Sequence, residues 1–278
     1  AASDVYKRQP NDKTTSVVLP ADIATTPRGC FQNCSALKTV VLPANMTKFN
    51  QDAFSGCLAL EEISIPAGVT SLVANMFQNC SSLAKITFEE SATAIEVGVN
   101  IWGSSKAAER GLVELYINRP VTTTGATGPA ALPFPGSAKL AKVVYGNNDI
   151  TEIPSYSYQN CTLLTEVALP SGLTSIGDQA FLNTGLTSID IPAGVTAIGS
   201  SVFNGCPALA DVKMGDAVTR IGDMAFYNAG VKTLTWPSAL TSIGAYAFSG
   251  TAFEGELTLP AAVATIGTQA FAKNNGVT

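Results

Sequence analysis

The chain has 278 residues, of which 46% are hydrophobic and 13% are charged, and its formal net charge is −5. This composition is too apolar for a disordered protein, and no run of about 18 apolar residues is long enough to span a membrane as a helix. The 16 lysines and arginines are spread thinly and form no basic patch. We therefore predict no nucleic-acid binding and no insertion into a membrane.

The first residues differ from everything that follows. Residues 1–14 fit no position of the repeat described below, and the chain begins with Ala1. We interpret this segment as an unstructured tail or a sequence artefact, with a natural polar linker as the alternative. The chain stops at Thr278, a few residues into a new repeat. We therefore expect a fragment of a longer protein, truncated at the C-terminus.

From about residue 15 onward, one motif recurs along nearly the whole chain. It reads Ala-Phe, then Leu-x-x-Ile-x-Ile-Pro, then Val-x-x-Ile-Gly, and its cleanest copy spans residues 180–199. Outside residues 78–158 the anchor aromatics recur every 22 or 23 residues. A period of this size predicts a solenoid of stacked repeats, about eleven units in a single domain from 15 to 278. The anchors are Phe31, Phe54, Phe77, Trp102, Phe134, Tyr158, Phe181, Phe203, Phe226, Phe248 and Phe271.

Each part of the motif predicts a local structure. Ile189 and Ile191 alternate with Asp190, which is the pattern of a short strand with one buried face, and the following proline ends that strand. Residues 179–181 predict a single helical or 3-10 turn that places the anchor ring in the core. Two residues after the ring stands an Asn or a Gly, which tolerates the left-handed conformation that closes such a turn. These positions are Asn33, Gly56, Asn79, Asn160, Asn183, Asn228 and Gly250.

The regularity breaks between residues 89 and 153. Trp102 replaces the usual Phe and is followed by an insertion at residues 104–110. The Thr-, Gly- and Pro-rich stretch from Pro120 to Pro135 predicts a loop. We consider two interpretations, a tolerated irregular unit or a loop that forms part of a recognition surface.

Six cysteines could indicate redox or metal chemistry. Five of them stand three residues after an anchor ring, where other units have Thr or Ala, so we expect buried structural thiols. Cys30 precedes Cys34 by four residues, which leaves a bond or a weak metal contact between them open. Because the chain has no His and no CxxC motif, we predict no metal site.

The sequence offers no catalytic constellation. The absence of His removes serine- and cysteine-protease triads and zinc-protease motifs together, and no phosphate-binding or dinucleotide-binding motif is present. The acidic pairs 61–62 and 89–90 are adjacent along strands, so their side chains point to opposite faces. We predict that the protein is not an enzyme and uses no cofactor.

The recurring Ala-Phe, Leu-x-x-Ile-x-Ile-Pro and Ile-Gly elements resemble the BspA-like leucine-rich repeats, over about residues 15–278. The resemblance implies a right-handed leucine-rich-repeat superhelix, made mainly of short β-strands with one helical or 3-10 turn per repeat and with its strands on the concave face. It also implies a secreted or cell-surface bacterial protein. Some family members bind host matrix proteins or other cells, and the family has no catalytic motif to transfer.

The exposed residues of the strands are the remaining candidates for function. We predict a shallow binding surface on the concave strand face, centred on Tyr116 because Tyr is a frequent interface anchor. The alternative is a solvated sheet face that serves solubility only. The candidate contact residues are Tyr116, Glu62, Glu114, Glu166, Asp190, Asp211 and Lys213.

These observations favour a non-catalytic binding module that mediates adhesion or recognition of an extracellular protein or glycan. Two other interpretations stay open. The repeats could be a structural spacer that holds another domain away from the cell, with no ligand of their own. They could also form an intracellular protein–protein scaffold, which fits the free thiols better.

Overall fold

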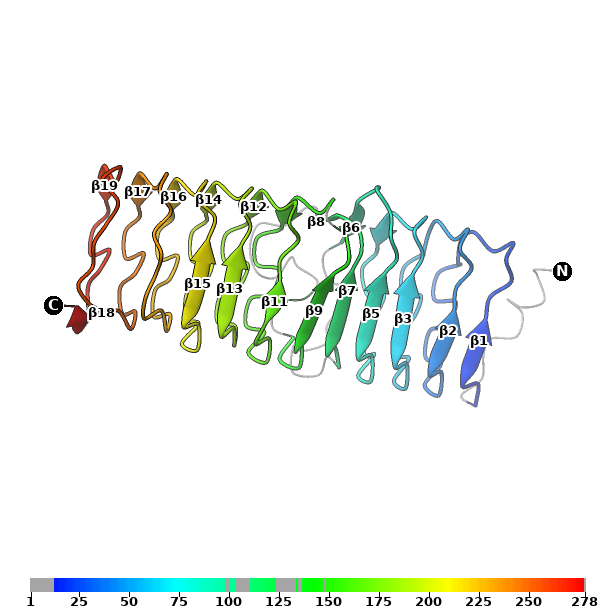
Figure 1. The fold of residues 1–278 in the computed structure, drawn as a ribbon. Helices are drawn as coiled ribbons and strands as arrows, with labels where there is room; N and C mark the ends of the chain where they lie inside the picture. The colour runs from blue at the N-terminus through cyan, green and yellow to red at the C-terminus, as the bar shows by residue number, and fades with distance from the viewer. Residues whose placement is uncertain are drawn as a thin grey trace. The chain divides into compact units, whose positions relative to one another are not determined.

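The computed structural model describes residues 13–98, 101–103, 111–123, 134, 137–147 and 149–277. The chain divides into two compact units, Ala1–Leu140 (unit 1) and Ala141–Thr278 (unit 2). In each unit the chain winds through successive turns that stack their short strands in parallel ladders (Figure 1). Of the predicted tail at residues 1–14, residues 1–12 lie outside the described residues.

Unit 1 contains two sets of strands, one for each side of the repeat. On the Leu-x-x-Ile-x-Ile-Pro side, β1 (Ser16–Val18) pairs with β2 (Thr39–Val41), and β3 (Glu62–Ile65) pairs with β5 (Lys85–Phe88), which pairs with β7 (Glu114–Ile117). On the Val-x-x-Ile-Gly side, β4 (Ser71–Leu72), β6 (Ile95–Val97) and β8 (Val121–Thr123) form a second parallel ladder. This arrangement confirms the predicted solenoid of leucine-rich-repeat type.

Unit 2 has the same two sides, but their continuity differs. On the Leu-x-x-Ile-x-Ile-Pro side, β9 (Lys142–Tyr145) pairs with β11 (Val167–Ala168), and β13 (Ser188–Ile191) pairs with β15 (Asp211–Met214). A last pair joins β18 (Glu254–Gly255) and β20 (Gly276–Val277). The other side is one ladder of six strands, namely β10 (Glu152–Ile153), β12 (Ser175–Ile176), β14 (Ala197–Ile198), β16 (Arg220–Ile221), β17 (Ser242–Ile243) and β19 (Thr265–Ile266).

The alternation of the strands places one row of side chains in the core and one row outside. In β13, Ile189 and Ile191 are buried whereas Ser188 and Asp190 are exposed. The same pattern holds in β3. Because side chains alternate between faces along a strand, the outward row consists of the residues that the motif leaves variable.

The anchor rings form a stacked column inside each unit. In unit 1, the Phe31 and Phe54 rings lie 5.3 Å apart, and Trp102 continues the column at 5.8 Å from Phe77. In unit 2, Phe203 and Phe226 stack at 5.2 Å. The Phe31–Phe54 and Phe203–Phe226 pairs are stacked, whereas Trp102 is tilted by 46° against Phe77, and aromatic side chains favour such offset and tilted arrangements. The predicted role of the anchors as core-filling residues is confirmed.

The turn that carries each ring is not helical, which corrects one detail of the prediction. The described residues contain no α- or 3-10 helix. Among them there is therefore no helix that is long and apolar enough to cross a membrane. The Asn and Gly positions after the rings have the expected positive φ, for example 54° at Asn183. A second left-handed residue stands two positions before the ring, such as Gln179 with φ 58°. Left-handed residues on both sides of Phe181 interrupt any right-handed helical turn.

These turns are held by a hydrogen-bond ladder of their own. The N–H groups of Gln179, Phe181 and Asn183 donate to carbonyls of the next repeat, over 2.9, 3.0 and 2.8 Å. The same three bonds recur in the following repeats, starting from Ser201 and Met224. Since buried backbone groups must find partners, this ladder offsets the cost of the left-handed residues.

The irregular region of unit 1 is tied to the regular repeats by a buried arginine. Arg119 has no exposed surface, and its Nε and Nη2 donate to the Thr93 carbonyl over 3.0 and 2.7 Å. Its Nη1 reaches the Pro66 carbonyl at 3.4 Å. Burial lowers the pKa of this guanidinium.

The predicted loop from Pro120 to Pro135 is wrong in its first part, because Val121–Thr123 forms β8 and pairs with β6. Val121–Thr123 is a run of β-branched residues that lies beside β6, and it extends the ladder of β4 and β6 although the composition around it is typical of a loop. Residues 104–110 and 124–133 lie outside the described residues.

All six cysteines are free thiols, and five are buried. Cys57 and Cys80 donate to the carbonyls of the anchor residues Phe31 and Phe54, each over 3.1 Å. Burial raises the pKa of the Cys80 thiol to about 12, and it also raises the pKa of Cys57. No disulfide joins Cys30 and Cys34, and the prediction of buried structural thiols is confirmed for the five cysteines that follow an anchor ring.

Candidate binding surface on the strand faces

The outward face of unit 1 carries a compact network of polar side chains. The ladder places Lys85 directly opposite both Glu62 and Glu114. Lys85 Nζ lies 3.6 Å from Glu62 Oε2 and 5.2 Å from the centre of the Tyr116 ring. The Tyr116 hydroxyl donates to Glu114 Oε2 over 2.9 Å. The predicted residues of unit 1 therefore contact one another, and Lys85, which was not among them, links Glu62 to Tyr116.

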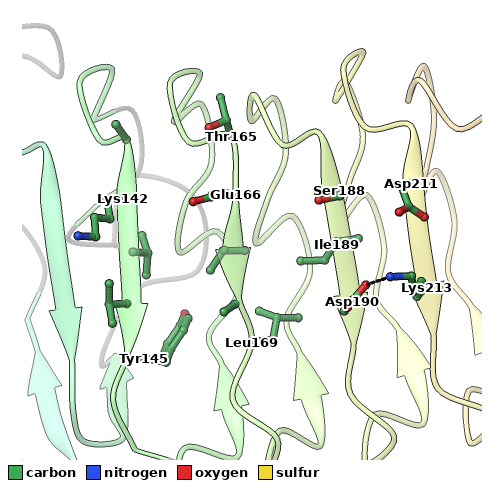
Figure 2. A pocket seen from close by; sticks show the side chains of 15 residues that line it. Lys142, Tyr145, Thr165, Glu166, Leu169, Ser188, Ile189, Asp190, Asp211 and Lys213 are labelled. Carbon is green, nitrogen blue, oxygen red and sulfur yellow. Dashed lines mark ion pairs between the residues drawn. The ribbon is translucent and has the colours of Figure 1, made fainter.

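The outward face of unit 2 contains a concavity of about 780 Å³. It lies over β9, β11, β13 and β15, and its polar side chains come from β9, β13, β15 and the two residues directly before β11 (Figure 2). We call it the unit 2 groove. The side chains that the following argument uses are Lys142, Tyr145, Glu166, Asp190, Asp211 and Lys213.

The groove lies where the strand ladder is interrupted. Among the described residues, no ladder joins β11 to β13, although β13 and β15 pair over four residues. A backbone bond from Thr187 N–H to the Thr165 carbonyl, 3.0 Å long, holds the two repeats together just before these strands. A ladder that does not close leaves part of the facing backbone groups without a strand partner. The side chains of Thr165, Glu166 and Ser188 line the groove beside this interruption.

A difference in loop length accompanies this interruption. Leu164 follows its anchor Tyr158 by six residues, whereas Leu186 follows Phe181 by five. In the shorter loop, a side chain at Gly185 would have its Cβ only 2.3 Å from the Thr162 carbonyl oxygen, so only glycine fits. In the shorter loop the backbones of the two neighbouring repeats lie close together. The equivalent strand residues Val167 and Ile189 are therefore 22 residues apart instead of 23.

Three carboxylates and two ammonium groups face the unit 2 groove. Lys213 Nζ lies 3.4 Å from Asp190 Oδ1, an exposed pair drawn in Figure 2. The Glu166 and Asp211 carboxylates make no hydrogen bond or ion pair within the described part of the chain. Because the groove is open to water, these carboxylates stay solvated and available for hydrogen bonding.

Tyr145 contributes a fixed aromatic ring to the unit 2 groove. Its hydroxyl lies 2.5 Å from the hydroxyl of Tyr158, a buried anchor that stacks on Phe181 at 5.3 Å. Burial raises the pKa of both phenols, so both are neutral at physiological pH. Two contacts thus hold the Tyr145 ring, one from the strand backbone and one from the core.

Sequence reasoning missed Tyr145, although a signal was present. Tyr145 occupies the strand position that other units fill with Ile65, Phe88 and Ile117. A hydroxyl in this otherwise apolar row requires a partner, which the buried Tyr158 supplies.

The predicted binding residues fall into two groups. Glu166, Asp190, Asp211 and Lys213 line the unit 2 groove together. The others, Glu62, Glu114 and Tyr116, lie in the unit 1 network. Whether either group contacts a ligand stays a prediction. Among the described residues, no group of three or more Cys, Asp or Glu side chains is placed to hold a metal ion.

Solved structures of similar repeat proteins exist, at low sequence identity. A leucine-rich repeat protein from Eubacterium ventriosum is 23% identical over 63% of this chain and 44% of that one, with a TM-score of 0.47. The chain therefore spans less than half the length of that structure. A leucine rich cell surface protein from Faecalibacterium prausnitzii is 20% identical over 95% and 80% of the two chains, with a TM-score of 0.45. The pneumococcal vaccine antigen PcpA is 16% identical over 93% and 67%, with a TM-score of 0.41.

No curated protein matches the sequence. The family described as "BspA type Leucine rich repeat region" matches it in six copies, over residues 9–100 and 133–254. These copies cover most of the chain, including the unit 2 groove and strands β3 and β5, whereas β7 with Glu114 and Tyr116 lies between the matched ranges. The chain therefore belongs to the BspA-type leucine-rich repeat family.

Proposed function

We propose that the chain is a non-catalytic recognition module that binds an extracellular protein or glycan through its outward strand faces. The unit 2 groove is the observation that carries this proposal. It combines carboxylates without protein partners, an ion pair, an aromatic ring and an interrupted ladder on one rigid scaffold. Concave sites with a few convergent polar groups are the usual places where ligands bind. A secreted or cell-surface location is part of the proposal and follows from the family resemblance.

A spacer without a ligand is the second candidate, and the unit 1 network favours it there. Glu62, Lys85, Tyr116 and Glu114 satisfy one another across the ladder. A ligand would have to displace these internal contacts, so its net binding free energy at this face would be small. The free thiols do not decide between an intracellular and an extracellular location, since five of the six are buried and protected from oxidation.

The test measures binding of the full chain to immobilised matrix proteins, mucins and cell-surface glycans. Two matched double variants separate the faces, Glu166→Ala with Asp211→Ala in unit 2, and Glu114→Ala with Tyr116→Ala in unit 1. We expect saturable binding that only the unit 2 variant weakens, by about tenfold or more. Loss in the unit 1 variant alone would place the site at Tyr116. No binding by a well-folded chain would support the spacer.

A further inference from the structure

The unit 2 groove has a mixed charge pattern that restricts its ligand. Lys142 lies on β9, Glu166 directly before β11, Asp190 on β13, and Asp211 and Lys213 on β15 (Figure 2). A polyanion would meet three carboxylates along this path, and a polycation would meet two ammonium groups. Like charges in contact cost binding energy and exclude partners. A ligand without net charge avoids both penalties.

The same residues offer many hydrogen bonds of both kinds. Carboxylates accept, ammonium groups donate, and the hydroxyls of Thr165 and Ser188 do both. A ligand with closely spaced hydroxyl groups, each of which can donate and accept, matches such a lining along its whole length.

The Tyr145 ring adds an apolar surface beside these polar groups. It is half-buried and lines the groove, and its hydroxyl is engaged by Tyr158 at 2.5 Å. A pyranose ring has one face of C–H groups that can pack against an aromatic ring while its hydroxyls point sideways. Because Tyr145 is already held in place, little conformational entropy is lost when a ligand packs on it.

From these observations we propose that the unit 2 groove binds a neutral oligosaccharide, with the Tyr145 ring under a sugar ring and Glu166, Asp211 and Lys213 bonded to its hydroxyls. The volume of about 780 Å³ lies in the range of roughly 300–1,000 Å³ typical of small-ligand sites. The groove is therefore large enough for several sugar rings. This inference rests on the proposed function, because it names the ligand class of the same surface.

Calorimetric titration of the full chain tests the inference. The probes are the neutral hexasaccharides of cellulose, starch, laminarin, chitin and xylan, with hexagalacturonate and hexalysine as charged controls. We expect saturable binding of at least one neutral hexasaccharide, and we expect neither charged control to bind more tightly. The affinity should change little between about 50 and 500 mM NaCl, because a neutral ligand is not screened by salt.

Variants then locate the site. Tyr145→Ala should weaken binding about tenfold or more, whereas Tyr145→Phe, which keeps the ring, should stay within about threefold of the unaltered chain. Glu166→Gln and Asp211→Asn change exposed side chains and should each weaken binding without affecting folding. Glu62→Gln is the matched control, since Glu62 holds the same strand position in unit 1, and it should bind like the unaltered chain.

Each other outcome overturns the inference. If no neutral hexasaccharide binds to the folded chain, the ligand class is wrong. The same holds if hexalysine or hexagalacturonate binds best with strong salt dependence. Should the chain bind an immobilised protein through Glu166 and Asp211 but no hexasaccharide, the proposed function stands and this inference fails. If it binds neither, both fail.

Discussion

The outward strand faces of the two units are built from one repeat, yet they use their charges differently. In unit 1, β3, β5 and β7 form a continuous ladder, and Lys85 stands directly opposite Glu62 and Glu114. In unit 2, the ladder stops between β11 and β13, and Glu166 and Asp211 face a groove. Cross-strand pairs stabilise a sheet only where the strands are in register. At these two places, the charged side chains pair across a continuous ladder in unit 1, whereas Glu166 and Asp211 beside the interruption in unit 2 stay available to a ligand.

The cores below the two faces are alike, and the largest predicted effect tests this. Phe54→Ala in unit 1 and Phe203→Ala in unit 2 each remove a buried ring that stacks on both neighbours. We expect each to lower the free energy of unfolding by about 3–5 kcal/mol, measured by urea denaturation. A cost below about 1 kcal/mol for one of them would show that its unit is loosely packed, and the comparison of faces would then lack a common scaffold.

The Tyr145–Tyr158 contact predicts a specific alkaline sensitivity of unit 2. Burial raises the pKa of both phenols above the unfolded value of about 10. Their stabilising effect is complete below that value and is lost as pH rises from it toward the folded pKa, because the unfolded state releases its protons first. Tyr145→Phe removes one of the two titrating groups and leaves the Tyr158 hydroxyl without its partner.

Two results follow for Tyr145→Phe. At neutral pH the variant should be less stable by about 1 kcal/mol, and above about pH 10 its stability should fall less steeply than that of the unaltered chain. Urea denaturation at several pH values measures both. Equal slopes would mean that the two hydroxyls do not titrate together, and that Tyr145 is held by its strand alone.

The smallest effect concerns the unit 1 network. Lys85→Met removes the ion pair between Lys85 and Glu62, in which the two side chains are 41% and 58% exposed, respectively. It also uncovers the Tyr116 ring. Exposed pairs contribute little, so we expect a loss of at most about 1 kcal/mol in urea denaturation. Lys38→Met, which breaks the similarly exposed pair with Glu61 at 3.4 Å, is the control. A much larger loss for Lys85 alone would show that the network holds the ladder together.

Much of the fold could be predicted because its determinants are local and repeated. The spacing of rings such as Phe181 and Phe203 and the alternation around Asp190 specify a period and a buried face. The second left-handed position could not be predicted in this way. At this position Tyr156, Met224 and Tyr246 have φ values of 63°, 54° and 56°, although such residues normally avoid positive φ. The stacked hydrogen bonds of neighbouring repeats impose it.

The site was predictable only in part, for a related reason. Glu166, Asp190, Asp211 and Lys213 could be placed on the outward row from the strand pattern alone. Their gathering around a groove depends on where the ladder stops, which is a property of two neighbouring repeats. Loop length does not account for the interruption between β2 and β3, because Leu37 and Leu60 follow their anchor rings by equal distances.

The short loop at Gly185 has a consequence for how such arrays diversify. The loop ahead of Val231 is equally short, and no strand is assigned in the residues 231–237 that follow it. Beneath both places the rings still stack, and the six-stranded ladder on the other side continues. Loss of a single codon can thus open the surface at a chosen rung while the core is inherited unchanged. An array of repeats can therefore gain a new outward surface without a new fold.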